Sequence, residues 1–289
     1  MRKPFILPLA ILAAALGFAA AVEEKATSDP LVTSGTFVPE ASSAPLPERM
    51  RLVSYNLHGP PTQRIPEMIE LLQSHPALKE APILSLQEVN RDHQGSGNKD
   101  MARELAQALK MHFAYAVEIE HGQGGGVRGL AILSRYPLSQ VERVQLPVKG
   151  PGGRRRITLG ATVELGQKRL RVYSLHLETR ISAKKRALQL EGLLENARKY
   201  SDLPIAVLGD FNTYASGHTR RVFELMEGDG FKCPLKGDKK TLQKAFFVRL
   251  KLDWIFVKNL SVLGADVEGQ ITVSDHRPLW VDIDTTRLP

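Results

Sequence analysis

The sequence predicts an α/β fold in which short buried strands end in polar residues at a common site. The segment 204–208 is an unbroken aliphatic run, as expected of a strand covered on both faces. Helical patterns at about 65–73, 98–110 and 182–199 lie between strand-like segments. Consecutive short strand candidates over 130–175, separated by turn signals, are typical of an antiparallel meander.

In the first half of the folded part, strands alternate with helices. The segment 51–59 is expected to be a strand that ends in polar residues and glycine, and 81–86 is a second strand that ends the same way. A third strand at 113–119 leads into the glycine-rich loop 121–126. No lysine and helix follow these glycines in the P-loop arrangement, so this loop does not predict a nucleotide cradle.

The buried strand at 204–208 ends abruptly in polar chemistry. Asp210 and Asn212 follow it, two positions apart. Side chains at i and i+2 of a strand face the same side, so both are expected to point into one site. Read alone, the segment fits a simple turn equally well.

The other strands of the second half are predicted at 130–134, 141–146, 156–165, 169–175, 252–257 and 279–283. The first four form the meander, and the fourth runs into His176. A helix is expected at 219–226 and a basic loop over 232–251. Asp253 then lies just inside a strand, whereas Asp275 and His276 precede the last one.

The N-terminus has the pattern of a secretory signal peptide. Basic residues precede an apolar stretch over 5–18, and three alanines at 19–21 fit a cleavage site. We therefore expect a signal peptide over 1–21, a flexible linker over 22–49 and a catalytic domain over 50–289. The protein would be periplasmic or secreted, or tethered to a membrane if the signal is retained.

Composition limits the classes of protein to consider. The only cysteine is Cys233, which excludes an intramolecular disulfide. Stability must therefore come from a core, for which a hydrophobic content of 43% is sufficient. The formal net charge of +8 favours polyanionic partners or an anionic membrane surface.

Polar and ionisable residues collect at the ends of the predicted strands. They are Asn56, Glu88, His176, Asp210 with Asn212, Asp253, and Asp275 with His276. Carboxylate and amide oxygens suit a hard cation such as Mg²⁺, and histidines donate hydrogen bonds or protons to phosphate. Together they indicate hydrolysis of a phosphate ester. A zinc site would need a tighter group of histidine or cysteine ligands.

Six motifs in order resemble those of the endonuclease/exonuclease/phosphatase superfamily, which includes DNase I, apurinic endonucleases, secreted sphingomyelinases and inositol polyphosphate 5-phosphatases. The motifs are Ser54-Tyr55-Asn56, Leu86-Gln87-Glu88-Val89, Ser174-Leu175-His176-Leu177, Gly209-Asp210-Phe211-Asn212, Leu252-Asp253-Trp254-Ile255-Phe256 and Ser274-Asp275-His276-Arg277-Pro278-Leu279. The resemblance covers about 50–285. It implies a four-layer α/β sandwich, with two mixed β-sheets packed face to face and helices outside.

The resemblance also implies a metal site. Glu88 would be the principal Mg²⁺ ligand, with Asn56 and Asp275 close to the metal. Mn²⁺ or Ca²⁺ are alternatives to Mg²⁺. His58 stands where apurinic endonucleases carry an aspartate near the metal, which argues against that subgroup.

The catalytic roles follow from the same resemblance. Asp210 would align the attacking water, and Asn212 would hold the phosphate. Asp253 would orient and charge His276, whose imidazolium would stabilise the transition state.

His176 matches the second histidine of DNase I and the sphingomyelinases, a candidate general acid for the leaving group. In that branch a glutamate supports this histidine. Glu118 is the corresponding candidate here, and a solvated surface glutamate is the alternative.

Two classes of anionic substrate are candidates, nucleic acid and anionic phospholipid. Arg180 and Lys184, from a basic cluster after His176, are candidates to bind substrate phosphate, whereas the cluster 154–156 is equally explained as a solvated rim. Nucleic acid and anionic phospholipid both suit such clusters. A nuclease is slightly favoured over a phospholipid phosphodiesterase or phosphatase, for which 245–248 would be a membrane-inserting hairpin or, alternatively, a covered strand. A catalytically inactive polyanion-binding module is the third alternative. We expect a monomer without an obligate protein partner.

Overall fold

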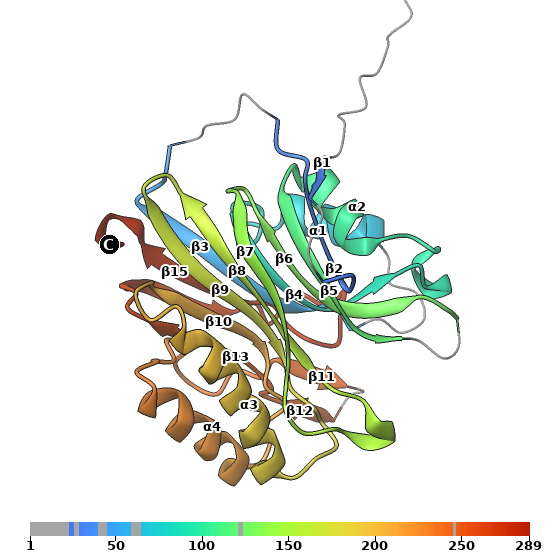
Figure 1. Ribbon diagram of the computed structural model, residues 1–289, viewed down its shortest axis with the longest axis vertical. Coiled ribbons are helices and arrows are strands. Elements are labelled where there is room, and N and C mark those ends of the chain that lie inside the picture. The colour runs from blue at the N-terminus through green and yellow to red at the C-terminus, as the bar shows by residue number, and fades with distance from the viewer. Residues whose placement is uncertain (1–22, 26–28, 40–44, 59–64, 121–123, 245–246) are drawn as a thin grey trace, which may run out of the picture.

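The protein is a sandwich of two mixed β-sheets with helices on both outer faces (Figure 1). The structure, a computed structural model, describes residues 23–25, 29–39, 45–58, 65–120, 124–244 and 247–289. The predicted signal peptide, 1–21, lies outside these residues. No helix of the described residues is long and apolar enough to cross a membrane.

The larger sheet has eight strands in the order β1-β2-β5-β6-β4-β3-β15-β14. They are β1 (Glu23–Lys25), β2 (Val32–Thr36), β3 (Arg49–Asn56), β4 (Ile83–Arg91), β5 (His112–Glu120), β6 (Val127–Ser134), β14 (Val262–Val267) and β15 (Leu279–Asp284). Strands β3 and β4 are parallel, and the other neighbours are antiparallel.

The smaller sheet has five strands in the order β13-β10-β9-β8-β7. They are β7 (Leu138–Gln145), β8 (Ile157–Leu165), β9 (Lys168–His176), β10 (Ile205–Asp210) and β13 (Asp253–Lys258). Strands β7, β8 and β9 form a meander, and β10 runs parallel to β9. The prediction that the strand at 130–134 belongs to this meander is wrong, because β6 pairs with β4 and β5 in the larger sheet. A separate hairpin, β11 (Leu242–Lys244) and β12 (Val248–Leu250), interrupts the predicted basic loop.

Two pairs of helices cover the sheets. Helices α1 (Ile65–Ser74) and α2 (Met101–Leu109) pack on the larger sheet, and α3 (Ala183–Arg198) and α4 (Ser216–Gly228) on the smaller one (Figure 1). The Ser182 hydroxyl caps α3 by accepting a hydrogen bond from the Lys185 N–H. Short 3₁₀ turns occur at η1 (Gln94–Ser96), η2 (Pro151–Gly153) and η3 (Thr285–Arg287).

Three layers of buried side chains hold the sandwich together. The layer between the sheets includes Leu52, Leu208 and Ile255, whereas Val53 contacts α1 and α2 and Val207 contacts α3 and α4. Alternate residues of a strand therefore serve different layers. This arrangement confirms the four-layer sandwich implied by the resemblance.

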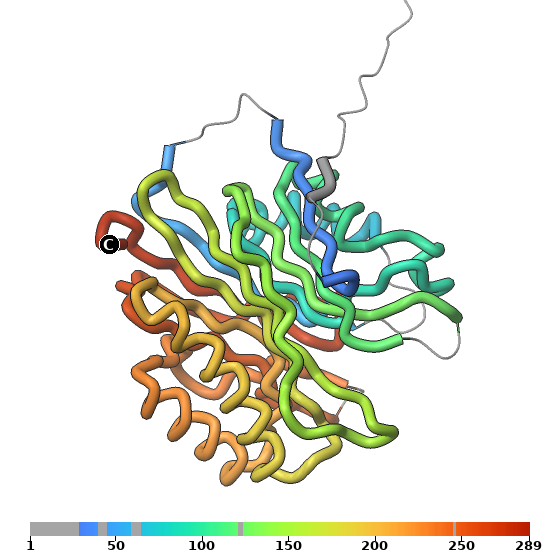
Figure 2. The backbone as a smooth tube through the Cα atoms, in the orientation of Figure 1, coloured from blue at the N-terminus to red at the C-terminus, as the bar shows by residue number. Residues whose placement is uncertain are grey.

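The predicted linker is wrong in part. Within 22–49, strand β2 pairs antiparallel with β5 and so extends the larger sheet, as can be followed along the blue tube in Figure 2. Its sequence, VTSGT, has no clear alternating pattern, and Val32 is its apolar anchor. Edge pairing rests on backbone hydrogen bonds, which leave little trace in the residue types. Strand β14, the opposite edge of the sheet, was likewise missed.

Candidate active site

The polar ends of the strands meet at one end of the space between the two sheets. In the smaller sheet Asp210 pairs with His176 on β9 and with Asp253 on β13, so the three residues lie side by side. Each lies an even number of positions along its strand from a residue of the layer between the sheets, as Asp210 does from Leu208. Each side chain therefore faces the larger sheet. From that sheet, Asn56 at the end of β3 donates from Nδ2 to Asp210 Oδ2 at 3.1 Å.

Glu88 reaches this site because β4 is irregular. Regular alternation would turn Glu88 toward the helices, together with Leu84 and Leu86. A register shift between Leu86 and Val89, with Glu88 at a φ of 57°, redirects the side chain. The bulge aims a buried carboxylate into the space between the sheets.

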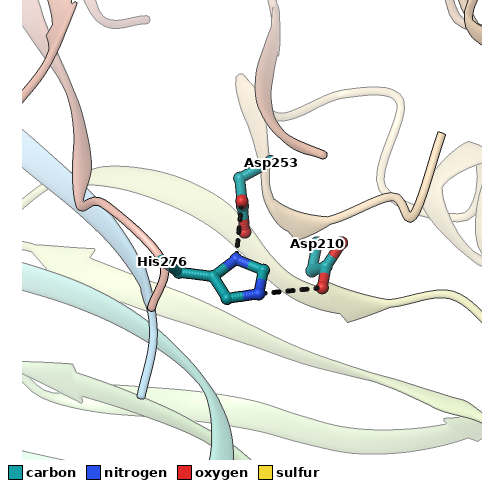
Figure 3. A group of neighbouring side chains, drawn as sticks. All are labelled: Asp210, Asp253 and His276. Carbon is teal, nitrogen blue, oxygen red and sulfur yellow. Dashed lines mark hydrogen bonds and ion pairs between the residues drawn. The ribbon is translucent and has the colours of Figure 1, made fainter. Parts of the chain in front are cut away.

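His276 lies between two aspartates (Figure 3). Its Nδ1 donates to Asp253 Oδ2 at 2.8 Å, and its Nε2 lies 4.0 Å from Asp210 Oδ2. Burial alone would lower the pKa of His276, but the two carboxylates outweigh burial and raise this pKa to about 10. His276 is therefore an imidazolium at neutral pH.

Asp210 is held by backbone and side-chain donors. Burial and the nearby Asp253 raise its pKa to about 6, although His276 and His176 oppose that shift. The Asn212 N–H donates to Asp210 Oδ1 at 2.8 Å. Behind it, Gly209 is required, because a Cβ at its φ of +152° would meet the Leu175 carbonyl oxygen at 2.0 Å.

Asn212 does not reach the site by strand alternation. Strand β10 ends at Asp210, and Asn212 adopts a φ of 50° in the following turn. Its Nδ2 donates to the Leu177 carbonyl at 2.8 Å. The expectation that Asp210 and Asn212 share a strand face is therefore wrong, although both are buried at the same strand end.

Glu88 lies among cationic partners. Its Oε2 accepts from Arg128 Nη1 at 2.7 Å and from His58 Nδ1 at 3.1 Å, and its Oε1 lies 3.7 Å from His176 Nε2. Burial would raise the pKa of Glu88, but His58, Arg128 and His176 together hold it well below its usual range. The carboxylate is ionised at neutral pH.

The oxygen atoms near His58 are of the type that a hard divalent cation binds. Asp275 Oδ2 lies 3.6 Å from His58 Nε2, so Glu88 and Asp275 approach opposite nitrogens of this ring. Asp275 Oδ1 is buried without a hydrogen-bond partner among the described residues. With the amide oxygen of Asn56, which accepts from the His58 N–H at 3.0 Å, the set offers two carboxylates and an amide.

A second group of possible metal-binding atoms consists of Asp210, Asp253 and His276, whose ligand atoms lie within 4.8 Å of one another. A histidine must be neutral to bind a metal. His276, with a pKa of about 10, is protonated on both ring nitrogens at neutral pH. This group is better suited to proton transfer and charge stabilisation than to metal binding.

A buried arginine fixes the orientation of His176. Arg156 Nη1 lies 3.0 Å from both His176 Nδ1 and Glu118 Oε2, and Arg156 Nε donates to Glu178 Oε2 at 3.1 Å. A guanidinium only donates hydrogen bonds, so the contact with Arg156 favours the tautomer in which Nδ1 accepts and Nε2 carries the proton. His176 thus presents an N–H toward Glu88 and Asp210, at 3.7 and 3.8 Å.

Two sequence-based interpretations of this region are corrected. Arg156 is not part of a solvated rim, because it is 9% exposed and paired with two glutamates. Glu118 is not a solvated acid either; it is buried, and its Oε2 lies 3.5 Å from His176 Nδ1. Burial raises the pKa of Glu118, but Arg156 and His176 lower it to about 2.

The predicted phosphate-binding pair lies at the protein surface. Arg180 and Lys184 are both exposed, and no side-chain contact within the described ranges links either to the catalytic groups. Arg186, from the same cluster, is buried and donates to the backbone carbonyls of Glu178 and Thr179. This cluster is therefore partly structural.

Sequence reasoning missed Arg128 and Glu178. Arg128 stands two positions before the buried Leu130 on β6, which places it on the inner face. A charged residue in phase with core positions was the available signal. Glu178, two residues after His176, gave no comparable signal.

Comparisons with known proteins agree with this geometry. A family profile described as "Endonuclease/Exonuclease/phosphatase family" matches residues 53–276. The chain belongs to this family. The matched segment contains every residue of the candidate site described above, from Asn56 to His276. As the family's name states, it comprises enzymes that hydrolyse phosphate esters.

Individual relatives are distant. The chain is 28% identical over 183 residues to "Uncharacterized protein YbhP" of Escherichia coli K12, covering 62% of this chain and 71% of that protein. An endonuclease/exonuclease/phosphatase from Beutenbergia cavernae superposes with a TM-score of 0.68 at 20% identity, over 82% of this chain and 72% of the other. A 3'-5' exonuclease from Neisseria meningitidis gives 0.59 at 20% identity, over 81% and 100%. These similarities show a shared fold.

Proposed function

We propose that the protein is a Mg²⁺-dependent phosphodiesterase, and we favour nucleic acid over phospholipid as its substrate. The observation that carries this proposal is the buried Asp253–His276–Asp210 group, which pairs an imidazolium with a carboxylate at the strand ends. Glu88, at the same end, supplies an ionised carboxylate for a cation. Mn²⁺ or Ca²⁺ would fit the same oxygen donors.

Each residue has a separate task in attack by water. When bound, the cation neutralises charge on the phosphate oxygens. Asp210 orients the water and accepts its proton as the new P–O bond forms. His276 donates from Nε2 to a phosphoryl oxygen, where negative charge develops.

On the other side of the phosphorus, the bond to the leaving oxygen breaks. His176 donates a hydrogen bond to that oxygen from Nε2, since Arg156 occupies Nδ1. From this position His176 is suited to the general-acid role, in which the Nε2 proton passes to the leaving oxygen as its bond to phosphorus breaks. Asn212 Nδ2 donates one N–H to the Leu177 carbonyl, and its second N–H contributes to binding of the phosphate.

The balance of charge favours nucleic acid as substrate. The formal net charge is +8, and exposed cations such as Arg180 and Lys184 suit a phosphate backbone. A phospholipid is the second candidate, because Phe247 in the β11–β12 hairpin is 83% exposed. We further propose export by the N-terminal segment, to the periplasm or the medium, and a monomeric state.

We expect purified protein to release nitrophenol from bis-p-nitrophenyl phosphate with Mg²⁺ and not with EDTA. Plasmid DNA, RNA and sphingomyelin liposomes are then compared at equal phosphate concentration. Faster cleavage of DNA or RNA than of liposomes is the expected result. Preference for liposomes would select the phospholipid candidate, and no hydrolysis of any substrate would favour an inactive binding module.

The pH dependence of kcat/KM is expected to be bell-shaped. Activity needs the deprotonated carboxylate of Asp210, so it falls as pH drops through the pKa of this group, about 6 without a cation. A bound cation favours the charged form and would move this fall in activity to lower pH. Activity also needs protonated His276, so it falls as pH rises through about 10. A loss of activity between pH 7 and 8 would contradict the assignment of His276.

A further inference from the structure

A groove lies beside the catalytic strand ends, on the helix side of the smaller sheet. Its volume is about 470 Å³. Thr213 and Tyr214 line it directly after the catalytic Asn212, and Trp254 lines it directly after Asp253. The groove and the candidate site therefore lie at the same end of the smaller sheet, on opposite faces of it. A larger cavity of about 1290 Å³, around Tyr136, lies at the opposite end of the strands.

The groove carries an excess of positive charge. Its lining includes four cationic side chains and one carboxylate: Arg220, Lys240, Arg249, Lys251 and Asp238. Asp238 is already paired with Lys240 at 2.6 Å, and Lys251 Nζ donates to the Gly237 carbonyl at 2.8 Å. Arg249 is exposed, and no ion pair joins it to a carboxylate of the described residues. Arg249 is therefore available to an anionic ligand.

The groove also presents an aromatic ring to solvent. Tyr214 is 55% exposed, although large aromatic side chains are usually buried. Its ring lies beside that of His218, with the two centroids 5.8 Å apart. Trp254 lies deeper, and Lys251 Nζ occupies its face at 4.2 Å. Tyr214 is thus the ring on which a planar ligand can stack.

We propose that this groove is a subsite for a single-stranded nucleic-acid segment beside the cleaved bond. Arg249 binds a flanking phosphate, and Tyr214 stacks on a base. A phosphate backbone next to an exposed aromatic ring matches the two features of the groove together, whereas a phosphate ion alone would leave the ring unused. The inference rests on the proposed function and adds the segment of substrate that the active site itself does not hold.

The test compares Tyr214→Ala and Arg249→Gln with wild type on two substrates. On bis-p-nitrophenyl phosphate, which has no flanking nucleotide, both variants are expected to keep the wild-type kcat/KM. On a single-stranded DNA oligonucleotide, Tyr214→Ala is expected to lower kcat/KM by about 5- to 100-fold, the range that corresponds to loss of one stacked base. Arg287→Gln, an exposed arginine at the opposite end of β15, is the matched control.

Binding without turnover separates this inference from the proposed function. Fluorescence anisotropy of the same oligonucleotide in EDTA is expected to show weaker binding by both variants. Arg249→Gln should also reduce the slope of log K against log salt by about 0.7, as expected for one lost phosphate contact on a single strand. If wild type cleaves neither substrate but binds the oligonucleotide through Tyr214, the proposed function fails and the subsite stands.

Other outcomes overturn the subsite. Equal losses on both substrates would mean that the variants disturb the active site itself. Unchanged oligonucleotide binding in both variants would show that the strand passes elsewhere. Reduced binding to anionic phospholipid vesicles, with no oligonucleotide binding by wild type, would assign the groove to lipid headgroups instead.

Discussion

Replacing His276 with glutamine is expected to lower kcat/KM for bis-p-nitrophenyl phosphate by about 10³-fold. The imidazolium is buried, its Nδ1 donates to Asp253 at 2.8 Å, and its Nε2 faces Asp210 at 4.0 Å, where the proposed substrate phosphate would bind. Loss of one preorganised donor at a developing negative charge costs about 10²- to 10³-fold, and His276 also carries a full positive charge. Glutamine can donate one hydrogen bond but supplies no charge.

The pairing of His276 with Asp253 provides a second test of this role. Asp253→Asn is expected to lower the pKa of His276, because the partner carboxylate raises that pKa toward 10. The alkaline limb of the pH profile should therefore move to lower pH in this variant. In a His276→Gln background, Asp253→Asn should cost little more, since the two residues act as a unit.

A matched substitution controls for general damage. His75→Gln changes a histidine at the end of α1, outside the site, and should leave kcat/KM unchanged. Thermal unfolding of each variant shows whether the fold is kept. If Asp253→Asn and His276→Gln proved additive, or if the alkaline limb did not move, the charge-pair role of these residues would be wrong.

Much of the site was predictable because its residues follow strands with a strong local signal. Asp210, His176 and Asp253 each border an apolar run, and the register of the smaller sheet places them side by side. The order of the motifs along the chain was sufficient to predict that the strand ends meet. The fold class was predictable for the same reason, because buried strands and amphipathic helices have clear periodicities.

Local patterns did not predict the electrostatic partners, because they come from strands that are remote in sequence. Glu118 was named as a partner of His176 only through the family resemblance. Arg156, Glu118 and Arg128 belong to three different segments, and only the sheet arrangement brings them to His176 and Glu88. Each looks like an ordinary charged residue when the sequence is read locally. Their pairing depends on tertiary distances, which local patterns do not encode.

Backbone irregularities were a second reason why the site could not be fully predicted from the sequence. The bulge that redirects Glu88 and the positive φ of Asn212 break the alternation on which strand reasoning depends. Both lie at the site itself. Local rules thus failed where function required an unusual backbone, a pattern expected of active sites.

Replacing Glu88 with glutamine is expected to weaken Mg²⁺ binding by about 10²-fold. It should also lower kcat/KM by about 10³-fold, since a bound cation lowers the activation barrier by several kcal/mol. The substitution keeps the size of the side chain and removes its charge. Burial raises the pKa of Glu88, but His58, Arg128 and His176 lower it further, so the wild-type carboxylate is fully ionised. Isothermal titration calorimetry with Mg²⁺ and with Mn²⁺ measures the first effect.

A second readout does not depend on the metal. The hydrogen bond to Glu88 is the largest cause of the raised pKa of His58, so this pKa should fall in Glu88→Gln. NMR titration of the His58 ring in metal-free protein measures the shift. As a control, Glu195→Gln removes the same charge from an exposed position on α3. It should alter neither the pKa of His58 nor the affinity for the cation.

The outcome also decides between the two groups of possible ligands. If Glu88→Gln binds Mg²⁺ as tightly as wild type, the ion is not held by Glu88 and Asp275, and the Asp210, Asp253 and His276 group becomes the metal centre. His276 would then have to lose its proton on binding. Calorimetry in buffers of different ionisation enthalpy would detect the proton that His276 releases.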